Sequence, residues 1–303
     1  MFQPLLRAYL RYGVSVYDEN EPYVKKGDFL FQSLSEAFYD TEAYLSCLIN
    51  IIQNVDSNPE FYVCLSMQIS LFDKNPKIIS KISNVTLDMI SAAISSGKTA
   101  LISMGCCAAG LLFKYCTSVA AENYSNIYEM FSEFLRENSD VNAIKVLYLC
   151  VESEQFDVSK FPQYFQLMMH QLNHGDLQVQ KQVFNSLSKV AKKKKDCVEP
   201  YFDQYNSLIT FILSMDQKGD DNNNVESMVQ WALCCFRRAL NALPDLYHNN
   251  PQGIINYIIQ KIRENNYVVT KEAVKTVGAI AKKCSDEFRP LYEEFYNMLM
   301  GIC

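Results

Sequence analysis

The stretch Lys271–Ile302 carries a pattern that the chain repeats. It predicts two amphipathic helices, because apolar residues recur every three or four positions on both sides of a proline-containing link. A shift of 90 residues places Lys181–Ile209 onto it without a gap, and a shift of 168 residues, which carries Cys116 onto Cys284, gives a weaker third copy. Aligned pairs include Leu187 with Val277, Val190 with Ile280, Ala191 with Ala281, Pro200 with Pro290, and Tyr205 with Phe295. Such self-similarity predicts an array of helix pairs in place of one globular core.

The rest of the chain continues this order. The expected first and second helices are 98–117 with 123–137, 140–152 with 162–173, 176–194 with 200–214, 224–243 with 251–264, and 268–283 with 288–302. Second helices are expected to start near Asn84, Glu122, Pro162, Pro200, Pro251 and Pro290. All but one of these intervals lie near the roughly 40–47 residues of HEAT or armadillo units. The longer one contains the polar segment Asp216–Asn224, which we interpret as an exposed insertion loop. Units of two helices favour HEAT over armadillo.

We therefore predict an all-α fold, a right-handed α-α superhelix formed by antiparallel helix pairs. The prediction is a single solenoid over residues 1–303 with about six to seven pairs, clearest over 97–302. Before residue 97, we expect helices at Met1–Arg11, twice within Asp28–Val55 with Thr41 as an N-cap, at Pro59–Phe72 and at Val85–Ile94. The first helix has no cap, which indicates a fragment of a longer protein.

Composition narrows the class of function. The formal net charge of −6 argues against a general nucleic-acid binder, which would show a basic excess. The 11 cysteines have no framework spacing, which predicts free thiols in a reducing compartment. No apolar stretch is long enough to span a bilayer, so we expect no membrane insertion.

Motifs that could carry chemistry are incomplete. Gly97-Lys98-Thr99 resembles the end of a phosphate-binding loop, but Ala92 stands where that loop needs its first glycine. His170 and His174 could share a helix face, yet no third ligand in their helix completes a metal site. The lysine run Lys192–Lys195 suits a helix end, where cations complement the dipole, although a polyanion contact is the alternative. We expect no enzyme, no cofactor and no metal.

Acidic side chains are the candidate partner-binding residues. Asp203 aligns with Glu293, and both, with Glu294, lie off the apolar stripes of second helices. The expected insertion loop adds Asp216, Asp220 and Asp221. Second helices often line the concave face of a solenoid, so these six residues could attract a basic segment of a protein partner. Ordinary solvated charge is the competing interpretation.

The unit GAIAKKCSDEFRPLYEEFYNMLMGI resembles the HEAT repeats of the importin-β (karyopherin-β) family. The matching residues are Gly278, Ile280, Ala281, Phe288, Pro290, Leu291, Phe295 and Leu299. The resemblance implies a nuclear transport receptor, cytoplasmic and nuclear, that binds cargo on its inner helices, the GTPase Ran, and Phe-Gly nucleoporins between its outer helices. Ran contacts lie mainly in the family's N-terminal repeats, which this sequence does not clearly show. A HEAT scaffold or adaptor subunit of another complex, such as a phosphatase, ubiquitin ligase or chromatin assembly, is the alternative.

Overall fold

A computed structural model of the chain describes residues 2–15, 42–54, 63–65, 76–214, 222–247, 252–263 and 267–302. Within these ranges every regular element is a helix, which confirms the all-α prediction. None of the helices described there is both long enough and apolar enough to cross a membrane. The chain divides into two compact units, Met1–Gln155 and Phe156–Cys303.

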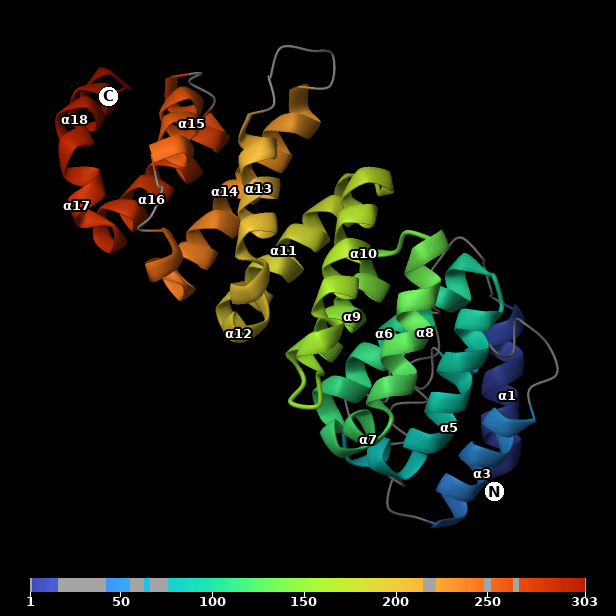
Figure 1. The fold of residues 1–303 in the computed structure, drawn as a ribbon. Coiled ribbons are helices and arrows are strands. Elements are labelled where there is room, and N and C mark those ends of the chain that lie inside the picture. The colour runs from blue at the N-terminus through green and yellow to red at the C-terminus, as the bar shows by residue number, and fades with distance from the viewer. Residues whose placement is uncertain are drawn as a thin grey trace. The chain divides into compact units, whose positions relative to one another are not determined.

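The N-terminal unit is a series of helices packed side by side (Figure 1). They are α1 (Phe2–Ser15), α3 (Glu42–Gln53), α5 (Pro76–Ser95), α6 (Thr99–Tyr115), α7 (Thr117–Glu122), α8 (Tyr124–Glu137) and α9 (Val141–Glu152). Helix α6 packs against both α5 and α9, and α9 also packs against α8. Gly97, with a φ of 67°, supplies the left-handed residue in the turn between α5 and α6.

The C-terminal unit continues the alternation of long helices and short links (Figure 1). Its helices are α10 (Phe161–His174), α11 (Leu177–Lys193), α12 (Lys195–Val198), α13 (Phe202–Leu213), α14 (Asn222–Ala242), α15 (Gln252–Arg263), α16 (Tyr267–Lys283), α17 (Ser285–Phe288) and α18 (Tyr292–Ile302). The described residues of this unit also include the 3-10 turns η1 (Val158–Lys160), η2 (Glu199–Tyr201), η3 (Pro244–Tyr247) and η4 (Arg289–Leu291). Helix α14 packs against α11 and α16, and α13 packs against α14 and α15.

The internal repeat is visible in the backbone. The residues that directly follow α6, α11 and α16 are Cys116, Lys194 and Cys284, which are related by the shifts of 168 and 90 residues. Their φ/ψ angles are −128°/59°, −129°/54° and −127°/58°. Their N–H groups donate to the carbonyls of Leu112, Val190 and Ile280 at 2.8, 2.8 and 2.7 Å. The sequence alignment therefore describes a true structural repeat.

The proline-containing links between paired helices are themselves helical, which the sequence analysis does not predict. In the two strongest copies a four-residue helix, α12 or α17, and a 3-10 turn stand between the long helices. Pro200 and Pro290 lie in those 3-10 turns, so α13 and α18 begin two residues after them. The links coil because they carry core residues: Cys197 and Val198 are 2% and 1% exposed. Burying these side chains requires backbone groups paired within the link.

Several expected boundaries need correction. Helix α5 begins at Pro76, well before the expected start near Asn84. It runs through Ser83 and Thr86 because both are buried, and the Thr86 hydroxyl donates to the Ile82 carbonyl at 2.9 Å. Asn222–Asn224, expected in the insertion loop, belong to α14. The remainder of that loop, Thr41 and most of Asp28–Val55 and Pro59–Phe72 lie outside the described residues.

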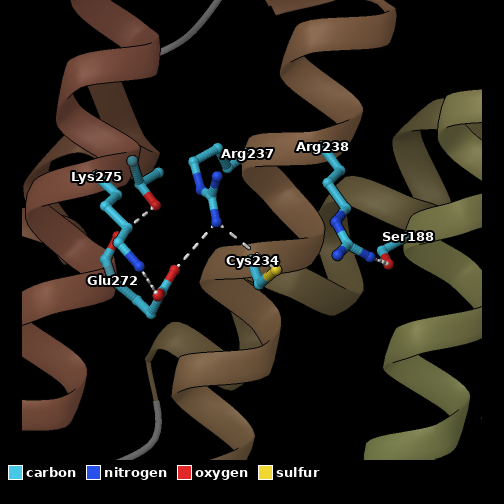
Figure 2. Close-up of polar contacts among 7 residues, drawn as sticks. Ser188, Cys234, Arg237, Arg238, Glu272 and Lys275 are labelled. Atoms are coloured by element: carbon cyan, nitrogen blue, oxygen red, sulfur yellow. Dashed lines mark hydrogen bonds and ion pairs between the residues drawn. The ribbon is translucent and has the colours of Figure 1, made fainter.

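Two adjacent arginines tie α14 to its neighbours on both sides (Figure 2). The Arg237 guanidinium lies 3.1 Å from the Glu272 carboxylate of α16, and Lys275 approaches the same carboxylate at 2.6 Å. The Arg238 guanidinium donates to the Ser188 hydroxyl of α11 at 2.6 Å. Since consecutive helix residues point about 100° apart, one helix turn can serve two interfaces.

The link between α10 and α11 consists of Gly175 and Asp176 alone. A Cβ at Gly175 would overlap the Val179 side chain, so only glycine fits. Asp176 caps α11, because its carboxylate accepts from the N–H groups of Gln178 and Val179, both at 2.9 Å.

Replacing Asp176 with Ala should lower the free energy of unfolding by about 1 kcal/mol, because two N–H groups of the first turn lose their acceptor. Chemical denaturation measures the change. Asp176→Ser is the matched control, since a serine hydroxyl also caps and should retain most of the stability. Equal losses in the two variants would contradict the capping role.

Candidate protein-binding surfaces

A groove of about 620 Å³ lies in the N-terminal unit, where α6 and α9 end beside α7. Its lining residues are Phe113, Thr117, Ser118, Ala120, Ala121, Leu149, Glu152, Ser153, Glu154 and Gln155. Phe113 and Leu149 are half-buried and Ala120 is fully buried, so the apolar side chains that line the groove are held in place by the packing behind them. A hollow of this size can hold an aromatic side chain with its neighbouring backbone.

Acidic groups stand at the rim of this groove. Glu152 ends α9 and Glu154 follows it, where the helix dipole is already negative. Burial, together with a hydrogen bond to Glu152, raises the pKa of the Tyr148 hydroxyl. That hydroxyl therefore stays neutral and donates to the Glu152 carboxylate. The groove joins an apolar floor to a negatively charged edge.

The acidic residues singled out from the sequence fall into three situations. Asp203 on α13 and Glu293 on α18 are exposed, as a partner contact requires. Glu294 is also exposed, but its Oε1 lies 2.8 Å from an Arg263 Nη2 of α15. Asp216, Asp220 and Asp221 lie outside the described residues. The ion pair leaves Glu294 less available to a basic partner than its sequence position indicates.

Thiols and histidines offer little chemistry in the part of the chain that the structure describes. Burial raises the pKa of the Cys106 and Cys150 thiols, and it raises that of Cys235 to about 12. These thiols are protonated near neutral pH and are poor nucleophiles. His170 and His174 are exposed on α10, with ring centroids 4.5 Å apart. No group of three or more His, Cys, Asp or Glu residues among the described ones is placed to hold a metal ion.

Sequence reasoning did not find the groove. Phe113 and Leu149 stand in different expected pairs, and neither belongs to a motif. The only sequence feature that could have indicated the groove is the repeat itself, because the first helices of neighbouring units lie side by side in a solenoid.

Comparison of the structure with solved structures identifies the fold, whereas comparison of the sequence with known families and proteins finds no match. No protein-family model and no curated protein matches the chain. Among solved structures, yeast importin-beta (Kap95p) matches 99% of this chain with a TM-score of 0.72 at 12% identity. The chain has a karyopherin-like HEAT fold. This confirms the predicted solenoid class and the resemblance to the importin-β family.

Two further solved structures match in the same way, one of Kap95 again and one of a second karyopherin, Kap121p. Kap95 in its complex with Nup1 matches 98% of the chain, with a TM-score of 0.73 at 12% identity. Kap121p bound to Pho4p matches 95%, with a TM-score of 0.69 at 16% identity. The chain spans 37% of the length of the Kap95 structure and 30% of that of Kap121p, about a third of each.

Proposed function

We propose that the chain works as a nuclear transport receptor of the importin-β type, a non-enzymatic protein-binding solenoid. The observation that carries the proposal is the karyopherin-like HEAT fold over 95% or more of the chain. Karyopherins of this fold have been solved with Nup1, Nup53p and Pho4p. Under this proposal the two units belong to one solenoid, the partners are cargo, Ran and nucleoporins, and the protein is cytoplasmic and nuclear.

The groove at the ends of α6 and α9 is the proposed docking place for a Phe-Gly nucleoporin segment. Both helices are first helices of their expected pairs, the outer ones in the resemblance to importin-β. The apolar floor formed by Phe113, Ala120 and Leu149 suits a phenylalanine ring, and a glycine beside it would let the peptide backbone come close.

The exposed carboxylates of Asp203 and Glu293 are the proposed contacts for a basic cargo segment. Both lie on second helices, α13 and α18, which are the inner helices of the resemblance. Charge complementarity of this kind raises the rate of encounter and is weakened by salt.

Filling the groove with Ala121→Trp should weaken the binding of a synthetic Phe-Gly repeat peptide about tenfold or more, because the indole takes the place of the incoming ring. Fluorescence polarisation measures the affinity. Phe211→Ser is the matched control: Phe211 is 63% exposed on α13 and is not one of the residues that line the groove, so losing it should leave peptide binding unchanged.

The full-length protein is tested for Ran·GTP and for Phe-Gly repeats by pull-down. Binding of neither ligand by the full-length protein would remove the transport-receptor proposal and leave the HEAT scaffold of another complex. Full peptide binding by Ala121→Trp would move the nucleoporin contact away from this groove.

A further inference from the structure

Helix α10 carries two histidines on one exposed face. His170 and His174 are four residues apart, about one helix turn, and both side chains are exposed. Their ring centroids lie 4.5 Å apart. Neither imidazole has a hydrogen bond or an ion pair with another residue in the part of the chain that the structure describes. The ring nitrogens of both histidines are therefore open to water or to a ligand.

The separation of the two rings fits one metal ion bound to both. An imidazole nitrogen lies about 2.0–2.1 Å from a bound divalent transition metal, which puts the metal roughly 3.2 Å from the ring centroid. Two rings at a right angle about the metal then have centroids roughly 4.5 Å apart, whereas a tetrahedral angle separates them by roughly 5.2 Å. The observed distance of 4.5 Å corresponds to the right angle. Square-planar and tetragonal sites with this angle are typical of Cu²⁺ and Ni²⁺.

The last turns of α10 are anchored, so the two rings start from a fixed backbone. Met168, Gln171 and Leu172 are buried and hold the helix against its neighbours. The Gln171 carbonyl accepts from the N–H of Gly175 at 2.9 Å, and the Leu172 carbonyl accepts from Nε2 of Gln180 in α11 at 3.1 Å. A metal that binds both rings therefore has little backbone to order, which favours its affinity.

The charges at this end of α10 favour a cation. His170 and His174 lie in the last two turns, where the helix dipole is negative. No Lys or Arg occurs between Phe161 and His174, so the helix itself places no fixed positive charge beside the pair. Asp176 follows two residues later, and its exposed carboxylate adds negative charge. A divalent metal ion would therefore be attracted to this end of the helix.

An open site needs fewer protein ligands than a closed one. The sequence predicts no metal here because no third ligand in α10 completes the set, and no group of three or more metal-binding side chains is placed together among the described residues. Water can occupy the positions that two imidazoles leave free, as it does at other open metal sites. Such a site binds its metal reversibly, and its free positions can accept a ligand from another molecule.

We propose that His170 and His174 form an open, two-imidazole site for a divalent transition metal, Cu²⁺ or Ni²⁺. Nitrogen ligands bind Cu²⁺ more tightly than Ni²⁺ or Zn²⁺, so Cu²⁺ is the tighter-binding ion. The proposal goes beyond the transport function: it concerns the end of α10, which does not line the α6–α9 groove, and it holds for a receptor or a scaffold.

Calorimetric titration of the untagged protein with Ni²⁺ tests the proposal. Ni²⁺ is the probe because Cu²⁺ would oxidise thiols, and the chain has 11 cysteines. One Ni²⁺ should bind per chain. His170→Gln and His174→Gln should each weaken binding about tenfold or more, because one imidazole alone loses the advantage of chelation. His248→Gln is the matched control: it removes the third histidine of the sequence and should leave the affinity unchanged.

The melting temperature gives a second measurement. Ni²⁺ should raise it in the wild type, because the metal binds the pair that the folded helix holds together, and the shift should be absent in both single variants. His170 and His174 are exposed, so circular dichroism should show these variants folded. No Ni²⁺ binding by the wild type, equal affinity in either single variant, or loss of binding in His248→Gln would overturn the proposal.

Discussion

Replacing Ile280 with Asp should unfold the C-terminal unit, whereas the same change one residue later, Ala281→Asp, should leave it folded. Ile280 is 1% exposed, and its counterparts Leu112 and Val190 are 0% and 1% exposed. A carboxylate at this position would be buried without a cation placed to pair with it, and this would lower the free energy of unfolding by about 4 kcal/mol or more. That loss is comparable with the whole stability of about 5–15 kcal/mol of a typical domain.

Ala281 is half-buried, so an aspartate there can reach water. The remaining cost is about 0.5 kcal/mol, from an acid near the negative end of α16. Thermal unfolding followed by circular dichroism compares the two variants with the wild type. Equal melting temperatures for Ile280→Asp and the wild type would mean that the assigned face of α16 is wrong.

The position of Ala281 shows where an internal alignment stops being informative. The repeat pattern places it on the apolar stripe with Ala191, which is 0% exposed, and the structure corrects this. Ala191 belongs to α11, against which the first helix of the next pair, α14, packs. Helix α16 belongs to the last pair of this sequence, so only α14 stands beside it as a first helix among the described elements. Sequence period assigns a helix face, but burial depends on the neighbour that covers it.

Helix positions were predictable because they depend on local spacing. The long helices from α6 to α18 lie where the five expected pairs place them, and the link residues repeat at the expected shifts. The start of α5 was not predictable, because Ser83 and Thr86 resemble a boundary until tertiary contacts bury them. The coiled links α12 and α17 were missed for the same reason, since their form follows from burial: Cys197 and Val198 are buried in α12, and Phe288 is buried in α17.

The candidate sites were predicted less completely than the fold. Asp203 and Glu293 were expected to be exposed because they lie outside the apolar stripes of their helices, and both are exposed in the structure. The Arg263–Glu294 ion pair joins two second helices, 31 residues apart, and no local pattern reports it. The groove unites side chains of two successive pairs in the same way. Local sequence thus predicts which residues face outward, whereas the ion pairs and grooves that form between repeats follow only from the three-dimensional structure.

Replacing Glu272 with Gln should lower the free energy of unfolding by about 1–2 kcal/mol, because the charge that holds Arg237 and Lys275 is lost. The Glu272 side chain is 12% exposed, so water does little to replace the two cations. The variant should still fold: Gln182 occupies the same position in the copy 90 residues earlier, where its amide donates to Ser186 at 3.1 Å. Glu294→Gln is the matched control, since its ion pair with Arg263 is 45% and 63% exposed and should contribute at most about 0.5 kcal/mol.

The pH dependence of the stability difference shows whether Glu272 stabilises the fold through its charge or through its packing. Burial alone would raise the pKa of Glu272, but the hydrogen bond and charge of Lys275, with those of Arg237, outweigh it and hold that pKa below its ordinary value. A carboxyl with a lowered pKa stabilises the folded state above its unfolded pKa and loses that contribution as pH falls through the folded value. The stability difference between wild type and Glu272→Gln should therefore be full at neutral pH and shrink in acid. Urea unfolding at a series of pH values measures it, and a difference that stays constant or grows in acid would show that Glu272 acts through packing alone.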